Sequence, residues 1–245
     1  MDNIEQMENL EQRSFSEIPA IINPSEHHMA LAFLLDTSGS MGFAQGGEVA
    51  AITALNEGLN RFKAEVCQNP QTKDILDVAI VEFNSNFRIV QEFVPVEYMD
   101  EVNLSAAGTT KMTPAIRQAL EMVSERSRFY RRSGTEPYKP WIILISDGAP
   151  DPGDDISIVA QEIREMESAG KVSFRSLGVQ GYDAKTLHTL CDGKVMKLEG
   201  TDFTSFFDWV NKSMRSVSQS SPGEKPKTER LTGNVVIDVQ NPDWD

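Results

Sequence analysis

The chain has 245 residues, of which 40% are hydrophobic, so it is long enough to bury one large core. Its 37 acidic side chains outnumber 23 basic ones, and the resulting formal net charge of -14 opposes binding to nucleic acid or to an anionic membrane surface. The two cysteines form no disulfide or metal pattern, and no apolar run approaches the roughly 18 residues of a membrane span, so we expect a cytoplasmic protein.

Six segments have the composition of β-strands, and two of them are apolar almost throughout, as strands buried on both faces are. In chain order, these strands are expected at 29–35, 76–83, 87–93, 141–146, 172–179 and 194–198. Four further segments show the 3.6-residue periodicity of helices. These helices are expected at 47–66, 113–132, 154–170 and 203–217.

Several helix ends are marked by particular residues. Thr113 is expected as an N-cap, with Pro114 at the first helical position, and Gly170 is expected to end the third helix. The first helix should lay one apolar stripe against a sheet. This stripe consists of Val49, Ile52, Leu55, Leu59, Phe62 and Val66.

The alternation of strands and helices predicts an α/β fold, a doubly wound and mostly parallel six-stranded sheet with helices on both faces. One connection departs from this pattern. The three residues 84–86 are too few for a parallel crossover, so 76–83 and 87–93 should form a hairpin and leave one antiparallel strand at the edge of the sheet.

We divide the chain into an acidic extension at 1–24, a single domain at 25–217, and a flexible linker and tail at 218–245. Within the tail, 235–239 is rich in β-branched residues and could lie against the edge of the sheet or pair with another chain. The tail ends with Asp243 and Asp245 around Trp244, so self-association through this tail is a further possibility.

Polar side chains gather where two of the buried strands end. Asp36, Ser38 and Ser40 alternate along one tight loop after the first strand, and Asp147 follows the fourth. The carboxyl ends of parallel strands meet at one edge of the sheet, where a threonine of the 106–114 loop can join them. Oxygen donors of this kind suit Mg²⁺, with Mn²⁺ or Ca²⁺ as alternatives.

Two other groups of charges have competing interpretations. Asp151, Asp154 and Asp155 could be additional cation ligands, but acidic residues at a helix start also face the positive end of the helix dipole, which is the interpretation we favour. A basic cluster could dock an acidic segment, although cations at a helix C-terminus need no partner. This cluster comprises Arg126, Arg128, Arg131, Arg132 and Lys139.

The run Asp36-Thr37-Ser38-Gly39-Ser40, a later threonine and the aspartate of "SDG" resemble the metal-ion-dependent adhesion site of von Willebrand factor type A (VWA) domains, and the resemblance extends from about residue 28 to 217. It implies a Rossmann-like sheet with one divalent ion on its upper face. By the spacing to the next helix, Thr110 rather than Thr109 matches the metal threonine. The resemblance further implies that Ser38, Ser40 and Thr110 bind the metal directly and that Asp36 and Asp147 act largely through water.

Two further stretches, "ISDGAPD" and "FTSFFDWVNKSMRSVS", resemble the TerY-like bacterial subgroup associated with tellurium resistance and stress response. That resemblance implies a stress-response or signalling complex with kinase-like or phosphatase-like partners. An open metal site of the VWA kind implies a partner protein that presents an aspartate or glutamate.

Enzyme activity is not expected. An aspartyl-nucleophile phosphatase needs a second carboxylate where this chain has Ser38, and the G-x-S-x-G elbow of serine hydrolases and the phosphate-binding P-loop are both missing from the sequence. We therefore expect a binding module. The alternatives are a structural subunit that holds a metal for stability and, less favoured, a metal-dependent hydrolase or phosphatase.

Overall fold

The computed structural model describes residue 23 and residues 25–44, 49–179, 181–192, 194–221 and 230–239. Most of the predicted acidic extension, much of the predicted linker, and the tail residues Asp243, Trp244 and Asp245 lie outside these ranges. Among the described residues, no helix combines the length and the apolar character needed to cross a membrane.

One seven-stranded sheet, in the order β3-β2-β1-β4-β5-β6-β7, forms the centre of the molecule. Its strands are β1 Met29–Asp36, β2 Leu76–Phe83, β3 Phe87–Pro95, β4 Trp141–Ser146, β5 Ser173–Gly178, β6 Lys194–Leu198 and β7 Val235–Val239. The five inner strands run parallel, whereas β3 and β7 are antiparallel to their neighbours. The α/β fold and the predicted hairpin are thus confirmed. The predicted count of six strands is one too few, because β7 adds to the edge of β6 and makes that edge antiparallel as well.

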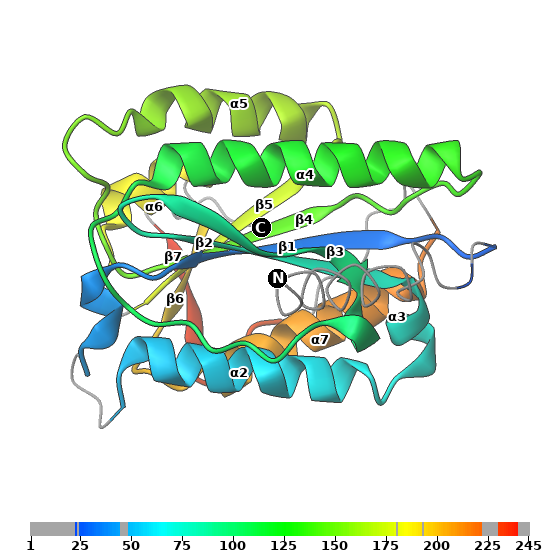
Figure 1. Ribbon diagram of the computed structural model, residues 1–245, viewed down its shortest axis with the longest axis horizontal. Helices are drawn as coiled ribbons and strands as arrows, with labels where there is room; N and C mark the ends of the chain where they lie inside the picture. Colours follow the sequence, from blue (N-terminus) through cyan, green and yellow to red (C-terminus); the bar gives the residue numbers. More distant parts are fainter. Residues whose placement is uncertain are drawn as a thin grey trace, which may run out of the picture.

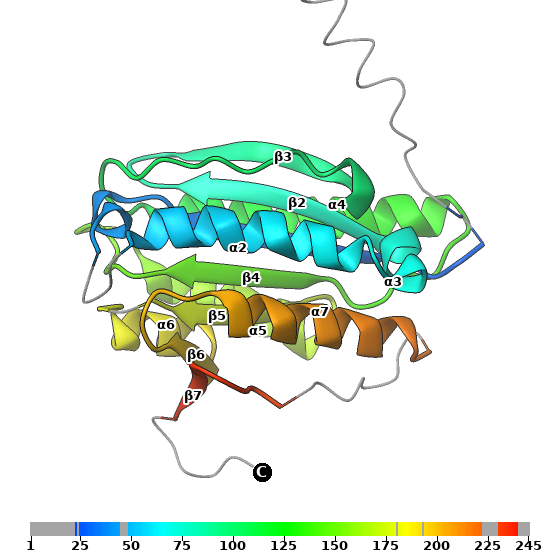
Figure 2. The ribbon, with the colours of Figure 1, turned by 90° about the horizontal axis from the view of Figure 1, so that it is seen from below.

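Helices cover both faces of this sheet, as Figures 1 and 2 show. The helices are α2 Ala51–Val66, α3 Pro70–Ile75, α4 Met112–Arg132, α5 Ile156–Ser168, α6 Ala184–Leu190 and α7 Thr204–Ser218, with short 3-10 turns η1 Gly39–Gly42 and η2 Val96–Tyr98. One apolar core lies between the sheet and α2 and α7, and a second lies between the sheet and α4, α5 and α6. Both faces of β1 are consequently buried along its whole length.

Two details of the predicted helices are wrong. Val49 precedes α2 and is exposed, whereas the other five residues of the predicted stripe are buried. Helix α4 begins at Met112, so Thr113 is not its N-cap. The missing cap comes from another loop: Asp154 Oδ2 accepts hydrogen bonds from the backbone N–H groups of Met112 (2.6 Å) and Thr113 (3.1 Å).

Helices α2 and α7 approach each other closely at Gly58. A methyl group at this position would lie 2.6 Å from the ring of Phe207, which also packs against Phe33 and Phe62 of the core. Phe207 is completely enclosed, so its ring has little room to move away. Glycine at this position therefore permits the contact between the two helices.

We predict that Gly58→Ala destabilises the protein by about 1–3 kcal/mol, because the added methyl overpacks the α2–α7 contact. Helix propensity alone predicts the opposite sign, a gain of up to about 1 kcal/mol. Urea unfolding measures the difference, with Glu57→Ala on the exposed face of the same helix as the control. A stabilised Gly58→Ala variant would contradict the prediction.

Candidate metal centre

Asp36 is the last residue of β1 and lies next to the end of β4, because the two strands are parallel neighbours. The Asp36 carboxylate is completely buried. Its Oδ2 accepts a hydrogen bond from Ser146 Oγ at 2.5 Å, and its Oδ1 accepts one from the backbone N–H of Ser38 at 2.8 Å. The first bond joins the ends of two strands and the second closes the turn that follows β1.

A chain of hydroxyl groups leads from this turn to the second carboxylate. The Oγ atoms of Ser38 and Ser40 are 3.0 Å apart, and Ser40 Oγ donates a hydrogen bond to Asp147 Oδ1 at 2.7 Å. Asp147 directly follows β4 and is almost fully buried. Four of the five predicted ligands therefore form one connected cluster.

The fifth predicted ligand, Thr110, faces the same cluster. A methyl group built on Gly148 would lie 3.4 Å from Thr110 Oγ1, and 3.8 Å from both Asp36 Oδ2 and Ser40 Oγ. Oxygen atoms from the loop after β1 and from the loop that carries Thr110 thus lie around one point beside Gly148. Because glycine has no side chain, this point remains open to a small ligand.

The loop that carries Thr110 is held in place by its backbone and by Asp151. The N–H of Ala107 donates to the carbonyl of Thr37 at 2.8 Å. Asp151 accepts from the Thr110 N–H at 3.0 Å and from Thr109 Oγ1 at 2.6 Å. Thr109 thus turns towards Asp151, and Thr110 remains as the threonine of the site.

The acidic residues near α5 make structural bonds. Asp151 braces the threonine loop, Asp154 caps α4, and Asp155 caps α5 by accepting from the N–H of Ser157 at 3.1 Å. The bond of Asp155 agrees with the helix-start interpretation, whereas Asp154 caps α4 and not the helix that it precedes. The role of Asp151 differs from both earlier interpretations, because it fixes the position of a candidate ligand.

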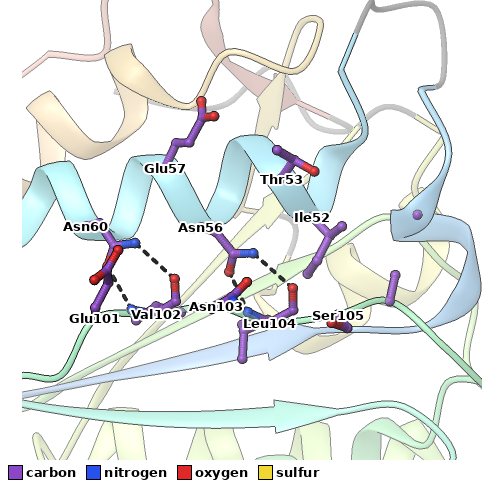
Figure 3. A pocket seen from close by; sticks show the side chains of 12 residues that line it. Ile52, Thr53, Asn56, Glu57, Asn60, Glu101, Val102, Asn103, Leu104 and Ser105 are labelled. Carbon is purple, nitrogen blue, oxygen red and sulfur yellow. Dashed lines mark hydrogen bonds between the residues drawn. The ribbon is translucent and has the colours of Figure 1, made fainter.

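A groove of about 760 Å³ lies between α2 and the extended segment 101–106 (Figure 3). The side-chain amide of Asn56 pairs with both the N–H and the carbonyl of Leu104, at 2.9 Å each. Asn60 pairs in the same way with Val102. Two amides one helical turn apart therefore fasten to α2 the segment that leads into the Thr110 loop.

The basic cluster at the end of α4 contains a structural ion pair. Arg126 donates to Asp77 Oδ2 through Nε at 3.0 Å and through a terminal nitrogen at 2.6 Å, and Tyr130 donates to the same oxygen. Asp77 is buried. Arg126 thus compensates a buried charge on β2, and this contact does not support a docking role for it.

Burial shapes the electrostatics of the site. It raises the pKa of Asp36 to about 6, and it also raises the pKa of Asp147. None of the ion pairs in the described part of the chain involves Asp36. A divalent cation would offset the cost of burying this charge, and the surrounding donors are all hard oxygens. The residues present therefore fit Mg²⁺.

The site differs from a carboxylate- or histidine-rich metal centre. Across the described ranges, no group of three or more His, Cys, Asp or Glu side chains is placed to hold a metal. The candidate set has two carboxylates and three hydroxyls, so hydroxyl oxygens would provide most of the protein ligands. Sequence reasoning missed Ser146, which bonds Asp36 and directly precedes Asp147.

The family model for the von Willebrand factor type A domain matches residues 30–211. The chain therefore belongs to the VWA domain family. No curated protein sequence matches it.

Solved structures with the same fold include the pilus adhesin SpaC from Lactobacillus rhamnosus GG, with a TM-score of 0.64, 15% identity, and coverage of 80% of this chain and 32% of that one. A von Willebrand factor type A protein from Catenulispora acidiphila has a TM-score of 0.56, 17% identity and coverage of 78% and 43%. The vWF domain of the type V pili tip protein Mfa5 from Porphyromonas gingivalis has a TM-score of 0.55 and 10% identity, with coverage of 81% of this chain and 99% of that one. The chain spans less than half of the first two proteins.

We predict that the metal-free protein loses stability as the pH rises from about 4 through 6. A carboxyl group whose pKa is higher in the native than in the unfolded state stabilises the fold while it is protonated, and this contribution disappears once it ionises. For Asp36, the shift from 3.8 to about 6 corresponds to roughly 3 kcal/mol. Urea unfolding in chelator at several pH values should show this decline in the wild type and a smaller one in Asp36→Asn.

Mg²⁺ should reverse the decline at neutral pH. Binding requires the ionised carboxylate, so Mg²⁺ should raise the unfolding free energy at pH 7 and have little effect at pH 4.5. Equal effects of Mg²⁺ at both pH values would contradict the assignment of Asp36 to the site.

Proposed function

We propose that this VWA domain is a metal-dependent protein-interaction module that binds one Mg²⁺ through Asp36, Ser38, Ser40, Thr110 and Asp147 and captures a carboxylate of a partner protein. One observation carries the proposal. Two buried carboxylates are joined by serine hydroxyls at the carboxyl edge of the sheet, around a point that Gly148 leaves open. VWA domains generally mediate protein interactions, and many use such a metal site.

The donor set explains how the module would work. Asp36 and Asp147 together balance the charge of one divalent ion, while Ser38, Ser40 and Thr110 add only neutral oxygens. A bound Mg²⁺ would supply an electrophilic centre that can accept one more oxygen ligand. An aspartate or glutamate of a partner is the natural donor, since its charge would be matched directly at the centre of the interface.

A role in catalysis is not part of the proposal. In the described structure, the side-chain hydroxyls of Ser38 and Ser40 bond to each other, and that of Ser40 also bonds to Asp147, so neither hydroxyl is paired with a histidine or lysine that could act as a base. The second candidate is a structural subunit whose metal serves stability alone. It differs from the first in predicting that metal-free protein loses its fold.

The cellular context rests on the sequence resemblance. We place the protein in a bacterial stress-response or signalling complex of the TerY-like kind, with kinase-like or phosphatase-like partners. Two of the proteins with the same fold are a pilus adhesin and a pili tip protein, which fits a role in adhesion or recognition for VWA domains more widely.

Two neighbouring threonines test the metal assignment. Thr110→Val should weaken Mg²⁺ binding at least tenfold, because it removes one neutral ligand from a site that has three. Thr109→Val should leave binding within about twofold, since Thr109 faces Asp151. Titration calorimetry with Mg²⁺ alone measures both. Equal affinities of the two variants would refute the assignment.

A double variant separates binding from folding. Ser38→Ala with Ser40→Ala should abolish partner capture in a pull-down with Mg²⁺, just as chelator should for the wild type. The unfolding free energy of this double variant should change by only about 1–2 kcal/mol, because the hydrophobic core does not depend on the metal. If circular dichroism shows metal-free wild type to be unfolded, the structural-subunit alternative is correct.

A further inference from the structure

Strand β7 is firmly held at the edge of the sheet. At its start, the Asn234 side-chain amide donates to the carbonyls of Glu199 (3.0 Å) and Asp202 (2.8 Å). Near its end, Asp238 Oδ2 accepts from the hydroxyl of Tyr182 and lies 3.1 Å from Nε2 of the buried His188. Both ends of β7 are therefore fastened, and the strand between them is preorganised.

The outer edge of β7 carries backbone groups that its pairing with β6 does not use. Asn234 and Glu199, which lie opposite each other, form the first hydrogen-bonded pair between the two chain segments, because the Asn234 carbonyl accepts from the N–H of Glu199. In an antiparallel ladder, such hydrogen-bonded pairs recur at every second residue. Residues 236 and 238 thus bond to β6, and the N–H and C=O groups of residues 235, 237 and 239 point outward. Among the described residues, β6 is the only strand that pairs with β7.

The opposite edge of the sheet is protected against such pairing, whereas β7 is not. Strand β3 has two register shifts against β2, carries exposed charges at Arg88 and Glu92, and ends at Pro95. Irregular pairing, charge and proline are the usual means of blocking an edge. In β7, Val236 and Ile237 are adjacent and point to opposite faces of the sheet, with exposures of 37% and 38%.

We propose that β7 is the surface through which two copies of this chain associate, edge to edge, by antiparallel strand addition. A two-fold axis at Ile237 would pair residue 235 with the partner's 239 and Ile237 with the partner's Ile237, so that all three outward residues form hydrogen-bonded pairs. Val236 would lie opposite the partner's Asp238. The seven-stranded sheets of the two copies would then continue into each other.

The second copy is favoured as the occupant because the edge is complementary to itself. The outward groups at 235, 237 and 239 are symmetric about Ile237, so one strand supplies every donor and acceptor that the other requires. A five-residue strand buries less than the roughly 800 Å² per partner of a stable interface, so the dimer should be reversible and in the micromolar range. The net charge of -14 also opposes association, and added salt should therefore strengthen it.

Two lysine substitutions, one residue apart, test the proposal by sedimentation velocity on the full chain. Ile237→Lys places like charges side by side at the two-fold axis and should raise the dimer dissociation constant at least tenfold. Val236→Lys places its charge opposite the partner's Asp238 and should keep or tighten the dimer. Ile237→Pro removes the outward N–H without removing a bond to β6, and it should also abolish the dimer.

Each outcome bears on the proposal. A wild-type mass that rises with protein concentration and with salt, in chelator as well as in Mg²⁺, supports it and shows that the metal site is not required. A monomer at every concentration overturns it and leaves the edge for a strand of a different protein. Equal dissociation constants for Ile237→Lys and Val236→Lys, with thermal unfolding showing both variants folded, overturn it as well.

Discussion

The burial of Asp36 sets the electrostatic constraint on this domain. The central strand β1 is covered on both faces, and its last residue brings a carboxylate to a place that water does not reach. A charge in such a position is costly unless polar groups or a cation compensate it. Ser146, Ser38 and the open point beside Gly148 can all be understood as responses to that single cost.

The loops around the site owe part of their positions to residues that are not candidate metal ligands. Asp151 reaches back 41 residues to hold the backbone of Thr110, and the amides of Asn56 and Asn60 tie the preceding segment to α2. The site can therefore keep its arrangement without depending on a ligand, which is what a binding module with exchangeable partners requires.

The sequence predicted much of the fold because its signals are local. Continuous apolar runs marked β1 and β4, and the short link 84–86 required a hairpin. Helices α3 and α6 were missed because six or seven residues give too little periodicity, although Asn69 and Asp183 are cap residues that could have marked them. The α4 cap by Asp154 and the bond from Ser146 to Asp36 depend on tertiary contacts, which no local pattern encodes.

The strand order has a consequence for how the chain is made. In the order β3-β2-β1-β4-β5-β6-β7, each strand after β1 pairs with one that precedes it in the sequence. A ribosome would release β1 first, then β2 and β3 onto one side of it, and then β4 to β7 onto the other. Every new strand would find its neighbour already synthesised, so the sheet can assemble during translation without waiting for the end of the chain.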